Sequence, residues 1–420
     1  MNKIKSIITH AEVLCVGTEI LIGDIVNTNA AYISQRLASL GIDQYHQSVV
    51  GDNPVRLKGF LAEALERADI VIMTGGLGPT YDDLTKETVA ELMGKEMELH
   101  KPSYDRLKEF FDSRNIVMTE NNVKQAYMPK GCIVMQNNNG TAPGAIIENE
   151  ETGKAVVILP GPPREMKPMF EESVVPYLES RSEWLFVSKN INIFGMGESA
   201  VENELIDIMK SSVNPTVAPY ALDGEVRLRI TSKTNTKEEG ERLCDGMIER
   251  LKATKVGGFI YGVDTNLETA LVSRLSEKGM KIAAAESCTG GMVTQKLTNV
   301  SGASAVLDGS VVSYANEIKA RLLGVSEDVL REKGAVSEEC ALQMAEGVRR
   351  LMGADIGVSV TGIAGPTGGT AEKPVGTVYI AVSTADGSSA KLLNIRNNGR
   401  EYIRNISAKN VLHLALSALK

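Results

Sequence analysis

The residues best suited to chemistry lie in the stretch Ala283–Met292, which reads AAAESCTGGM. The apolar run just before Glu286 predicts a buried strand, and a helical pattern begins near Gly290, so Ser287 is expected at the turn between them. Free N–H groups at the start of a helix bind oxyanions and phosphates, and here they would face the Ser287 hydroxyl. The same position also suits a serine or threonine that only caps the helix, and the stretch alone does not separate the two interpretations.

A nucleophilic serine needs a general base, and histidine is the usual one. One histidine lies deep in the last expected helix and three lie in a different part of the chain; they are His413, His10, His46 and His100. A Ser-His-Asp triad is therefore not expected, whereas a lysine with a lowered pKa could serve. Tyr314 and Lys319 lie on either side of a predicted strand-to-helix turn, at the same end of the sheet as Ser287. From spacing alone, a solvated Lys319 and a packed Tyr314 are the simpler interpretation.

Two further loops follow apolar strands in the N-terminal third of the chain. The strand predicted at 12–16 leads into the loop 17–29, and the strand at 69–73 leads into the glycine-rich loop 74–80. Strands that alternate with helices here predict a parallel sheet covered on both faces, and sites in such sheets lie at the carboxyl ends of the strands. Both loops are therefore expected at one edge of the sheet.

The side chains of these loops favour a phosphate and a divalent cation. The N–H groups of a glycine-rich loop can bind phosphate, and those of Gly75, Gly76 and Gly78 are the candidates. Carboxylates are the ligands that Mg²⁺ prefers. Four of them are expected at this edge: Asp82, Asp83, Glu19 and Asp24. The alternative is a glycine-rich turn followed by aspartates at a helix start, which needs no ligand.

The composition limits the class of protein. The 420 residues suggest two or three domains, and 43% hydrophobic and 23% charged residues are ordinary for a globular protein. The five cysteines are scattered and include no C-x-x-C pair, which argues against a disulfide framework or a zinc site. A net charge of −8 argues against binding nucleic acid by charge alone. Neither a membrane-spanning run nor a signal peptide at Met1–His10 is predicted, so we expect a cytoplasmic protein.

Five motifs of the C-terminal region resemble the C-terminal domain of the competence/damage-inducible protein (CinA) family: Glu286–Gly291, Ser313–Lys319, Gly334–Ser337, Ser359–Pro366 and Lys373–Thr377. In that family the domain is a nicotinamide mononucleotide (NMN) amidohydrolase. The resemblance implies that Ser287 is the nucleophile, Lys319 the general base and Tyr314 a residue that relays or positions the proton. The expected products are nicotinic acid mononucleotide and ammonia, and the resemblance implies no metal for this step.

Further site residues follow from this resemblance and from the expected loops. The N–H groups around Thr289, Gly290 and Gly291 are candidates for holding the oxyanion. The remaining candidates for nucleotide contacts are Asn316 and, for the phosphate, Gly362, Ile363, Ala364, Gly365 and Arg400.

Motifs of the N-terminal region resemble the molybdopterin-binding fold of the MoaB/MogA type and, more closely, the N-terminal half of CinA. They are Gly17–Ile20, Gly23–Asn29, Thr74–Asp83, Asn137–Gly144 and Leu159–Met166. In the CinA family this domain is associated with an ADP-ribose pyrophosphatase activity that depends on a divalent metal. The resemblance therefore implies Mg²⁺-type catalysis, with Asp82 and Asp83 as ligand candidates and Glu19 and Asp24 beside them.

A small α+β unit is expected between these two regions. The family has a KH-like domain here, but Gly195–Glu198 is not the G-x-x-G clamp of RNA-binding KH domains. Residues 186–255 hold ten basic and eleven acidic side chains, so the count gives no basic surface. A spacer or dimerisation role is favoured over nucleic-acid binding, and the family suggests a homodimer.

The expected fold is α/β in three domains: a MoaB/MogA-like parallel-sheet domain over 1–176, a KH-like linking domain over 177–255, and a C-terminal mixed α/β sandwich over 256–420. The expected function is a two-site hydrolase of pyridine-nucleotide salvage that acts on NMN and ADP-ribose, without a membrane. The alternative is a binding or scaffold protein linked to competence or DNA damage, with one or both sites inactive.

Overall fold

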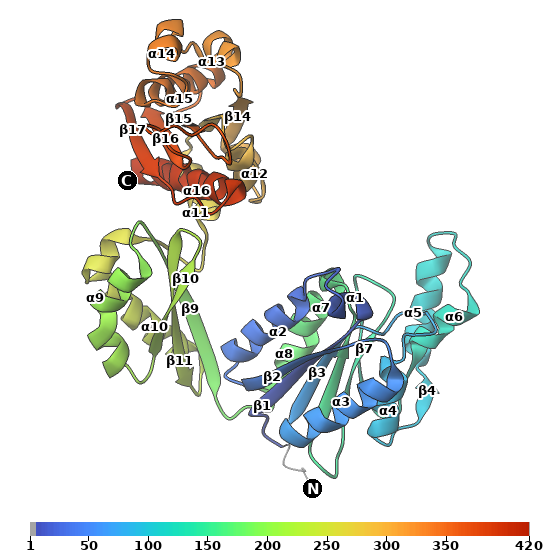
Figure 1. Cartoon of the computed structure of the whole chain (residues 1–420). Coiled ribbons are helices and arrows are strands. Elements are labelled where there is room, and N and C mark those ends of the chain that lie inside the picture. The colour runs from blue at the N-terminus through green and yellow to red at the C-terminus, as the bar shows by residue number, and fades with distance from the viewer. Residues whose placement is uncertain (1–5, 420) are drawn as a thin grey trace. The chain divides into compact units, whose positions relative to one another are not determined.

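The computed structural model describes residues 6–419. The sequence analysis predicted no signal peptide at Met1–His10, and half of that segment, residues 1–5, lies outside the described residues. The chain forms two compact units, Met1–Ser188 with Thr231–Cys244, and Lys189–Ile230 with Asp245–Lys420 (Figure 1). Within residues 6–419, no helix combines the length and apolar character needed to cross a membrane.

A six-stranded sheet forms the centre of the first unit. Its strands are β1 (His10–Val16), β2 (Asp43–Val50), β3 (Ile70–Thr74), β6 (Ile133–Met135), β7 (Gly144–Glu148) and β8 (Ala155–Leu159). They lie in the order β2-β1-β3-β8-β7-β6. The first four in this order are parallel, and β7 and β6 add to them as antiparallel strands. The predicted parallel sheet is thus present, with an antiparallel extension at one side.

Helices cover both faces of this sheet, as predicted (Figure 1). They are α1 (Thr18–Leu21), α2 (Thr28–Ser39), α3 (Pro54–Arg67), α4 (Thr85–Leu92), α5 (Lys101–Asp112), α6 (Glu120–Val123), α7 (Pro163–Met169) and α8 (Val175–Glu179), with a π-helical turn over Phe170–Val174. Successive strand residues point to opposite faces. Val13 and Cys15 accordingly pack in the core with α2, while Leu14 and Val16 pack in the core with α3.

The helix expected directly after the glycine-rich loop begins later than predicted. It is α4, and it starts at Thr85, so Asp82 and Asp83 lie in the turn before it. The Thr80 hydroxyl donates to both carboxylates, and the Thr80 N–H donates to Asp83 Oδ2 at 2.9 Å. Such local side-chain bonds compete with helix formation, which explains why the turn persists.

The middle domain has a four-stranded sheet in the order β10-β11-β9-β12. Its elements are β9 (Leu185–Phe194), α9 (Glu198–Ser211), β10 (Thr216–Leu222), β11 (Glu225–Thr234), α10 (Lys237–Lys252) and β12 (Ile260–Val263). The strands β10 and β12 were not expected from the sequence. Both lie at the edges of the sheet, and β10 contains Pro219, a residue that weakens a strand signal and is tolerated at an edge.

A five-stranded sheet forms the centre of the C-terminal domain. Its strands are β13 (Ile282–Glu286), β14 (Leu307–Val312), β15 (Ile356–Gly362), β16 (Thr377–Thr384) and β17 (Gly387–Asn394), in the order β14-β13-β15-β16-β17. The strands β14, β13 and β15 are parallel, and β16 and β17 are antiparallel. The predicted mixed α/β domain is confirmed, and the carboxyl ends of the three parallel strands lie side by side.

Two helical layers enclose this sheet (Figure 1). The helices are α11 (Leu267–Lys278), α12 (Met292–Thr298), α13 (Asn316–Leu323), α14 (Glu327–Glu332), α15 (Glu338–Met352) and α16 (Arg400–Ala418). Ala284 of β13 packs in the core with α11, α12 and α16. Its neighbours Ala283 and Ala285 point to the other face and pack in the core with α13 and α15.

Gly347 allows α15 to approach α13 closely. A Cβ atom at this position would lie 1.9 Å from the carbonyl oxygen of Leu323, the last residue of α13. Because that oxygen belongs to the backbone, a larger residue could be accommodated only by moving a helix. The helix α13 carries Lys319, so this contact also fixes where that lysine lies.

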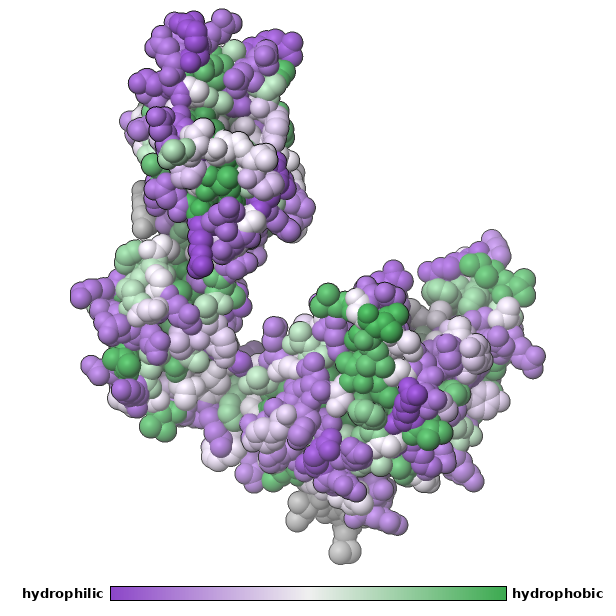
Figure 2. All heavy atoms as spheres, viewed as in Figure 1, coloured by the Kyte–Doolittle hydropathy of each residue, from purple (hydrophilic) through white to green (hydrophobic). Residues whose placement is uncertain are grey.

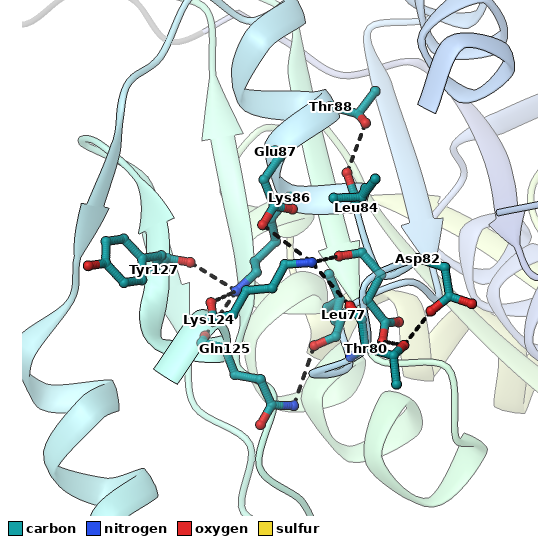
Figure 3. A network of polar contacts seen from close by, with 11 residues as sticks. Leu77, Thr80, Asp82, Leu84, Lys86, Glu87, Thr88, Lys124, Gln125 and Tyr127 are labelled. Carbon is teal, nitrogen blue, oxygen red and sulfur yellow. Dashed lines mark hydrogen bonds and ion pairs between the residues drawn. The ribbon is translucent and has the colours of Figure 1, made fainter. Parts of the chain in front are cut away.

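The first unit contains a buried lysine that holds a backbone segment. Lys86 of α4 is 2% exposed, and its Nζ donates to the carbonyl oxygens of Lys124, Gln125 and Tyr127 at 3.0, 3.0 and 2.9 Å (Figure 3). All three protons of the ammonium group are therefore satisfied, as a buried charge requires. The bonds fasten the segment 124–127 to α4.

The segment 124–127 also supports the turn that bears Asp82 and Asp83. The Nζ of Lys124 donates to the carbonyl oxygens of Thr80, at 3.3 Å, and Asp83, and lies 3.8 Å from the Glu87 carboxylate (Figure 3). The two lysines thus form a chain of contacts from α4 to the turn that bears Asp82 and Asp83.

We predict that Gly347→Ala lowers the free energy of unfolding by about 1–3 kcal/mol, because the added methyl group overpacks the contact with α13. Gly246→Ala is the matched control, since Gly246 lies exposed in α10 with open space around its Cβ position. That change should leave stability unaltered or raise it by up to about 1 kcal/mol. Thermal unfolding of both variants tests this, and a Gly347→Ala protein as stable as wild type would contradict it.

We also predict a pH-dependent contribution of Lys86 to stability. Burial lowers the pKa of Lys86 to about 8, whereas an unfolded lysine titrates near pH ~10.4. Between these values the unfolded chain binds more protons, so the stability contributed at this position rises with pH, by up to about 3 kcal/mol. The free energy of unfolding of wild type should therefore increase relative to Lys86→Met from about pH 8 to about pH 10.

Urea unfolding followed by the fluorescence of Trp184 measures this difference, because Trp184 is the single tryptophan of the chain and lies in the first unit. Lys108→Met, at an exposed position of α5, is the control and should show no such trend. A difference between wild type and Lys86→Met that stays constant over this range would argue against a lowered pKa.

Candidate active sites

The predicted residues of the C-terminal site follow three neighbouring parallel strands. Ser287 comes directly after β13, Ser313 and Tyr314 come after β14, and Gly362 ends β15. Pairing places Glu286 opposite both Val312 and Val360. The site therefore lies at the carboxyl edge of the sheet, where the sequence analysis expected it.

Ser287 and Lys319 are in direct contact. The Nζ of Lys319 lies 3.2 Å from Ser287 Oγ, 2.7 Å from the carbonyl oxygen of Ser313 and 3.3 Å from that of Tyr314. Lys319 is fully buried, and Ser287 is 9% exposed. The interpretation of Lys319 as a solvated helix residue is therefore wrong. α13 directs this side chain inward, across the end of β14, onto the hydroxyl that follows β13.

This arrangement favours a neutral amine that can accept a proton. Burial lowers the pKa of Lys319, because an ammonium group without water is destabilised. A neutral amine has two protons and one lone pair. The two protons can go to the carbonyl oxygens of Ser313 and Tyr314, which leaves the lone pair for the hydroxyl proton of Ser287. This is the geometry required of a general base.

The neighbouring thiol is a poor alternative nucleophile. Cys288 is 6% exposed, and burial raises the pKa of its thiol to about 11. Since only the thiolate is a good nucleophile, Cys288 is expected to stay unreactive.

The helix after the site is not capped by Ser287 or Thr289, so that interpretation is wrong. The N-cap residue of α12 is Gly291, and the buried carboxylate of Glu286 supplies the cap. It accepts bonds from the N–H groups of Gly291, Val293 and Thr294 at 2.9, 3.1 and 2.9 Å, and from the Thr294 hydroxyl at 2.7 Å. The Ser287 hydroxyl is thereby left available for chemistry.

The same cap alters the predicted oxyanion donors. The N–H of Gly291 is bound to Glu286, and the N–H of Gly290 donates to the Ser287 carbonyl oxygen at 3.2 Å. Both glycines have positive φ angles of 99° and 60°, which the tight turn requires. Of the predicted set, only the N–H of Thr289 has no hydrogen-bond partner among residues 6–419.

Tyr314 and Arg400 meet on the solvent side of the site. The Tyr314 side chain is 63% exposed, and its hydroxyl oxygen accepts a bond from Arg400 Nη2 at 3.1 Å. Arg400 Nη1 donates to the carbonyl oxygen of Gly365 at 2.7 Å. Towards Lys319, Tyr314 contributes its backbone carbonyl, and its phenol points to Arg400, so nothing in this geometry tests the predicted proton relay.

Other predicted nucleotide contacts are less available. The N–H of Ile363 donates to the Thr377 carbonyl at 2.9 Å and Gly362 pairs with Val378, so these two residues serve the sheet, and Ala364 is buried. Asn316 is exposed in the first turn of α13. Its helix has Ala315 at the N-cap position, and within residues 6–419 no other residue contact fixes the Asn316 side chain, so its predicted contact with a nucleotide stays a prediction.

The predicted N-terminal site surrounds a cavity of about 720 Å³ at the carboxyl edge of the first sheet. Among the predicted residues, those that line it are Glu19, Gly75, Gly76, Gly78, Asp82 and Asp83. Asp24 is exposed and is not among the residues that line the cavity, so its role as a ligand stays a prediction.

Asp52, which the sequence analysis missed, lines the cavity in place of Asp24. Its carboxylate accepts bonds from the N–H and hydroxyl of Thr18 at 3.0 and 2.8 Å. The signal was present in the sequence, since Asp52 lies in the loop after β2, as Asp82 and Asp83 lie in the loop after β3.

The two glycines that open the glycine-rich loop are required by packing. A Cβ at Gly75 would lie 2.1 Å from the Val16 carbonyl oxygen, and one at Gly76 would lie 2.1 Å from Thr85 Oγ1. The N–H of Gly75 donates to the Leu159 carbonyl at 3.0 Å and is therefore not free for a phosphate. Any phosphate contact of this loop has to come from residues beyond Gly75.

The cavity combines carboxylates with an apolar wall. Hydrogen bonding from Thr80 lowers the pKa of Asp82, which keeps this carboxylate ionised. Within residues 6–419, no three acidic, histidine or cysteine side chains are grouped as a complete metal site. Figure 2 shows apolar side chains over α1 and the following segment; the large exposed ones there are Leu21, Ile22, Ile25 and Val26, of which the last two line the cavity.

Comparison with known families assigns three consecutive regions of the chain. The CinA C-terminal domain matches residues 264–419, a domain described as a probable molybdopterin binding domain matches 12–180, and the damage-inducible protein CinA KH domain matches 188–262. These three matches support the MoaB/MogA-like domain, the KH-like linking domain and the C-terminal domain of the predicted fold.

Individual proteins match along almost the whole chain. A CinA-like protein of Dictyoglomus turgidum is 50% identical over 96% of this chain and 98% of its own, and a CinA-like protein of Kosmotoga olearia is 48% identical over 97% and 98%. A crystal structure of the competence/damage inducible protein CihA from Agrobacterium tumefaciens is 40% identical over 36% of this chain and 93% of its own, with a TM-score of 0.36. The chain therefore belongs to the CinA family.

Proposed function

We propose that the C-terminal site is a serine–lysine amidohydrolase. The observation that carries this proposal is the buried contact of 3.2 Å between Lys319 Nζ and Ser287 Oγ, at an amine whose other two oxygen neighbours are backbone carbonyls. Such a pair activates a hydroxyl without a histidine or a metal ion.

The proposed reaction has two halves. Lys319 takes the proton of Ser287 while Oγ attacks the amide carbon, and the resulting ammonium group then gives this proton to the departing amine. Ammonia leaves, and an ester between Ser287 and the acid remains. In the second half Lys319 takes a proton from water, the hydroxide attacks the ester carbon, and the proton returns to Ser287 as the acid is released.

The substrate that we propose is NMN, with nicotinic acid mononucleotide as the product. The resemblance of the five C-terminal motifs to the family domain supports this choice. A cationic group for the phosphate is present in Arg400, which is exposed beside the site and held by Tyr314 and Gly365. Guanidinium groups bind phosphate with two parallel hydrogen bonds, which supports Arg400 as the phosphate contact.

We propose that the N-terminal cavity hydrolyses ADP-ribose with a divalent cation. Mg²⁺ in proteins is commonly held by one or two carboxylates together with substrate phosphates, and Asp82 and Asp83 fit this mode better than a complete protein cage. The bound cation would stabilise negative charge on the phosphates. The wall formed by Ile25 and Val26 suits the base of a nucleotide.

A binding or scaffold role is the second candidate, since the name of the relative from Agrobacterium tumefaciens refers to competence and damage. A binding or scaffold role does not require a buried lysine in contact with a serine. The intact pair of Ser287 and Lys319 therefore favours an enzyme.

We predict that Ser287→Ala and Lys319→Met each lower ammonia release from NMN by ~10³-fold or more, because nucleophile and base act as one unit. Lys391→Met, at an exposed position of β17, is the control and should keep full activity. Activity of the wild type should persist in EDTA. Wild-type protein without activity on NMN would show that the substrate is wrong, and an active Ser287→Ala protein would remove this serine from the mechanism.

The rate should also depend on pH in a defined direction. Lys319 must be neutral to accept a proton, so the rate rises with pH through its pKa, which burial places below the ordinary lysine value. Lys319→Arg keeps its charge at these pH values and should be inactive throughout.

For the N-terminal site, Asp82→Asn should lower Mg²⁺-dependent hydrolysis of ADP-ribose by about 10²-fold or more, because the substitution removes the charge that the cation needs. Asp112→Asn, an exposed residue at the end of α5, is the isosteric control. Release of ammonia from NMN should be unchanged in both variants. Equal hydrolysis of ADP-ribose by wild type and Asp82→Asn would exclude Asp82 as a ligand.

A further inference from the structure

An arginine of the last helix binds the turn that carries Ser287. Arg404 lies in the second turn of α16. Its Nε donates to the carbonyl oxygen of Cys288 at 3.1 Å, and its Nη2 donates to that of Thr289 at 2.7 Å. The sequence motifs around Ser287 do not include Arg404, which lies more than 110 positions further along the chain.

The turn is also held by Glu286. This fully buried carboxylate accepts the N–H groups at the start of α12, so one charged residue binds the donors of the turn and another binds its acceptors. Ser287 lies between these two anchors. Its own N–H donates to the Val360 carbonyl of β15 at 2.9 Å, which fixes the turn to the neighbouring strand.

The position of Arg404 determines the direction of one free N–H group. The Cys288 carbonyl and the Thr289 N–H belong to the same peptide unit, and in a trans peptide these two groups point in opposite directions. Because Arg404 draws the carbonyl to its own side, the Thr289 N–H points away from Arg404. A cation on the carbonyl also polarises the peptide unit and strengthens its N–H as a donor.

Thr289 is fully buried beside Ser287 and has two polar groups without a hydrogen-bond partner in the described part of the chain. Its N–H has no partner among residues 6–419, and neither has its buried hydroxyl. Unpaired buried polar groups are rare in folded proteins and call for an explanation. The adjacent Gly290 and Gly291 cannot replace this donor, since their N–H groups are already bound.

We propose that Arg404 is a positioning residue for the amidase, which aims and polarises the Thr289 N–H so that this group binds the oxyanion formed when Ser287 attacks. The proposal rests on the amidohydrolase function proposed above and adds a residue that acts through the backbone. Arg404 itself contacts neither the substrate nor Ser287 Oγ in this arrangement.

The test compares Arg404→Met and Arg404→Lys with wild type, and uses Arg396→Met as the matched control, since Arg396 is an exposed arginine of the same domain. Loss of an oxyanion donor typically costs ~10²–10³-fold in kcat. We expect Arg404→Met to lose about this factor in kcat for ammonia release from NMN, with a KM within about threefold of wild type. Arg404→Lys should recover part of the loss, and the control should match wild type.

Two further measurements separate this role from a structural one. The pH at which kcat reaches half its maximum should not move in Arg404→Met, because Lys319 is untouched. The rate at which a small fluorophosphonate labels Ser287, read by mass spectrometry with Ser287→Ala as the blank, should fall in parallel with kcat, since this reaction uses the same nucleophile and donor. Thermal unfolding checks that the variants are folded.

The outcomes are distinguishable from failure of the proposed function. If wild type is labelled by the fluorophosphonate but releases no ammonia from NMN, the substrate is wrong, and the labelling rates still decide the role of Arg404. Unchanged labelling and kcat in a folded Arg404→Met protein would overturn the proposal. A raised KM with normal kcat would also overturn it, because Arg404 would then be a binding residue. Absence of labelling in wild type would overturn both proposals.

Discussion

The C-terminal site depends on the burial of one amine. Lys319 is fully enclosed, and in the part of the chain that the structure describes it forms no ion pair with a carboxylate. A carboxylate at this place would hold the ammonium form and raise the pKa, whereas two backbone carbonyls accept protons without adding a full charge. The close approach of α13 and α15 through Gly347, and the turn after β14, both serve to place this amine.

A second buried lysine shows how small the difference between a structural amine and the proposed general base is. Lys86 and Lys319 each have three oxygen neighbours and a pKa lowered by burial. All three neighbours of Lys86 are carbonyl oxygens, which can only accept hydrogen bonds. This lysine therefore has a structural role, which is to bind the segment 124–127 to α4. One neighbour of Lys319 is a hydroxyl, which can also donate. Because a hydroxyl replaces one carbonyl oxygen, the lone pair of a neutral Lys319 can accept a proton from Ser287.

The sequence allowed the position of both sites to be predicted, because apolar strands that end in polar turns mark the carboxyl edge of a parallel sheet. Ser287, Asp82 and Asp83 were found in this way. Asp52 could have been found by the same rule. The roles of Glu286 and Arg404 could not, because Glu286 looks like part of a buried strand and Arg404 like one polar residue of a long helix. Only the folded chain brings both charges to the turn.

The failed expectations have a common physical cause. The glycines and loop residues assigned to phosphate or oxyanion binding were chosen for their N–H groups, and several of those groups are already bound: Gly75 to Leu159, Ile363 to Thr377, and Gly291 to Glu286. A turn at a strand end must first satisfy its own backbone before it can serve a ligand. Few polar groups remain unpaired after this requirement is met. In the turn after β13 they include the N–H and the hydroxyl of Thr289. Candidates for a functional role in such a turn are therefore identified by the hydrogen bonds that the fold leaves unmade, which a motif alone does not reveal.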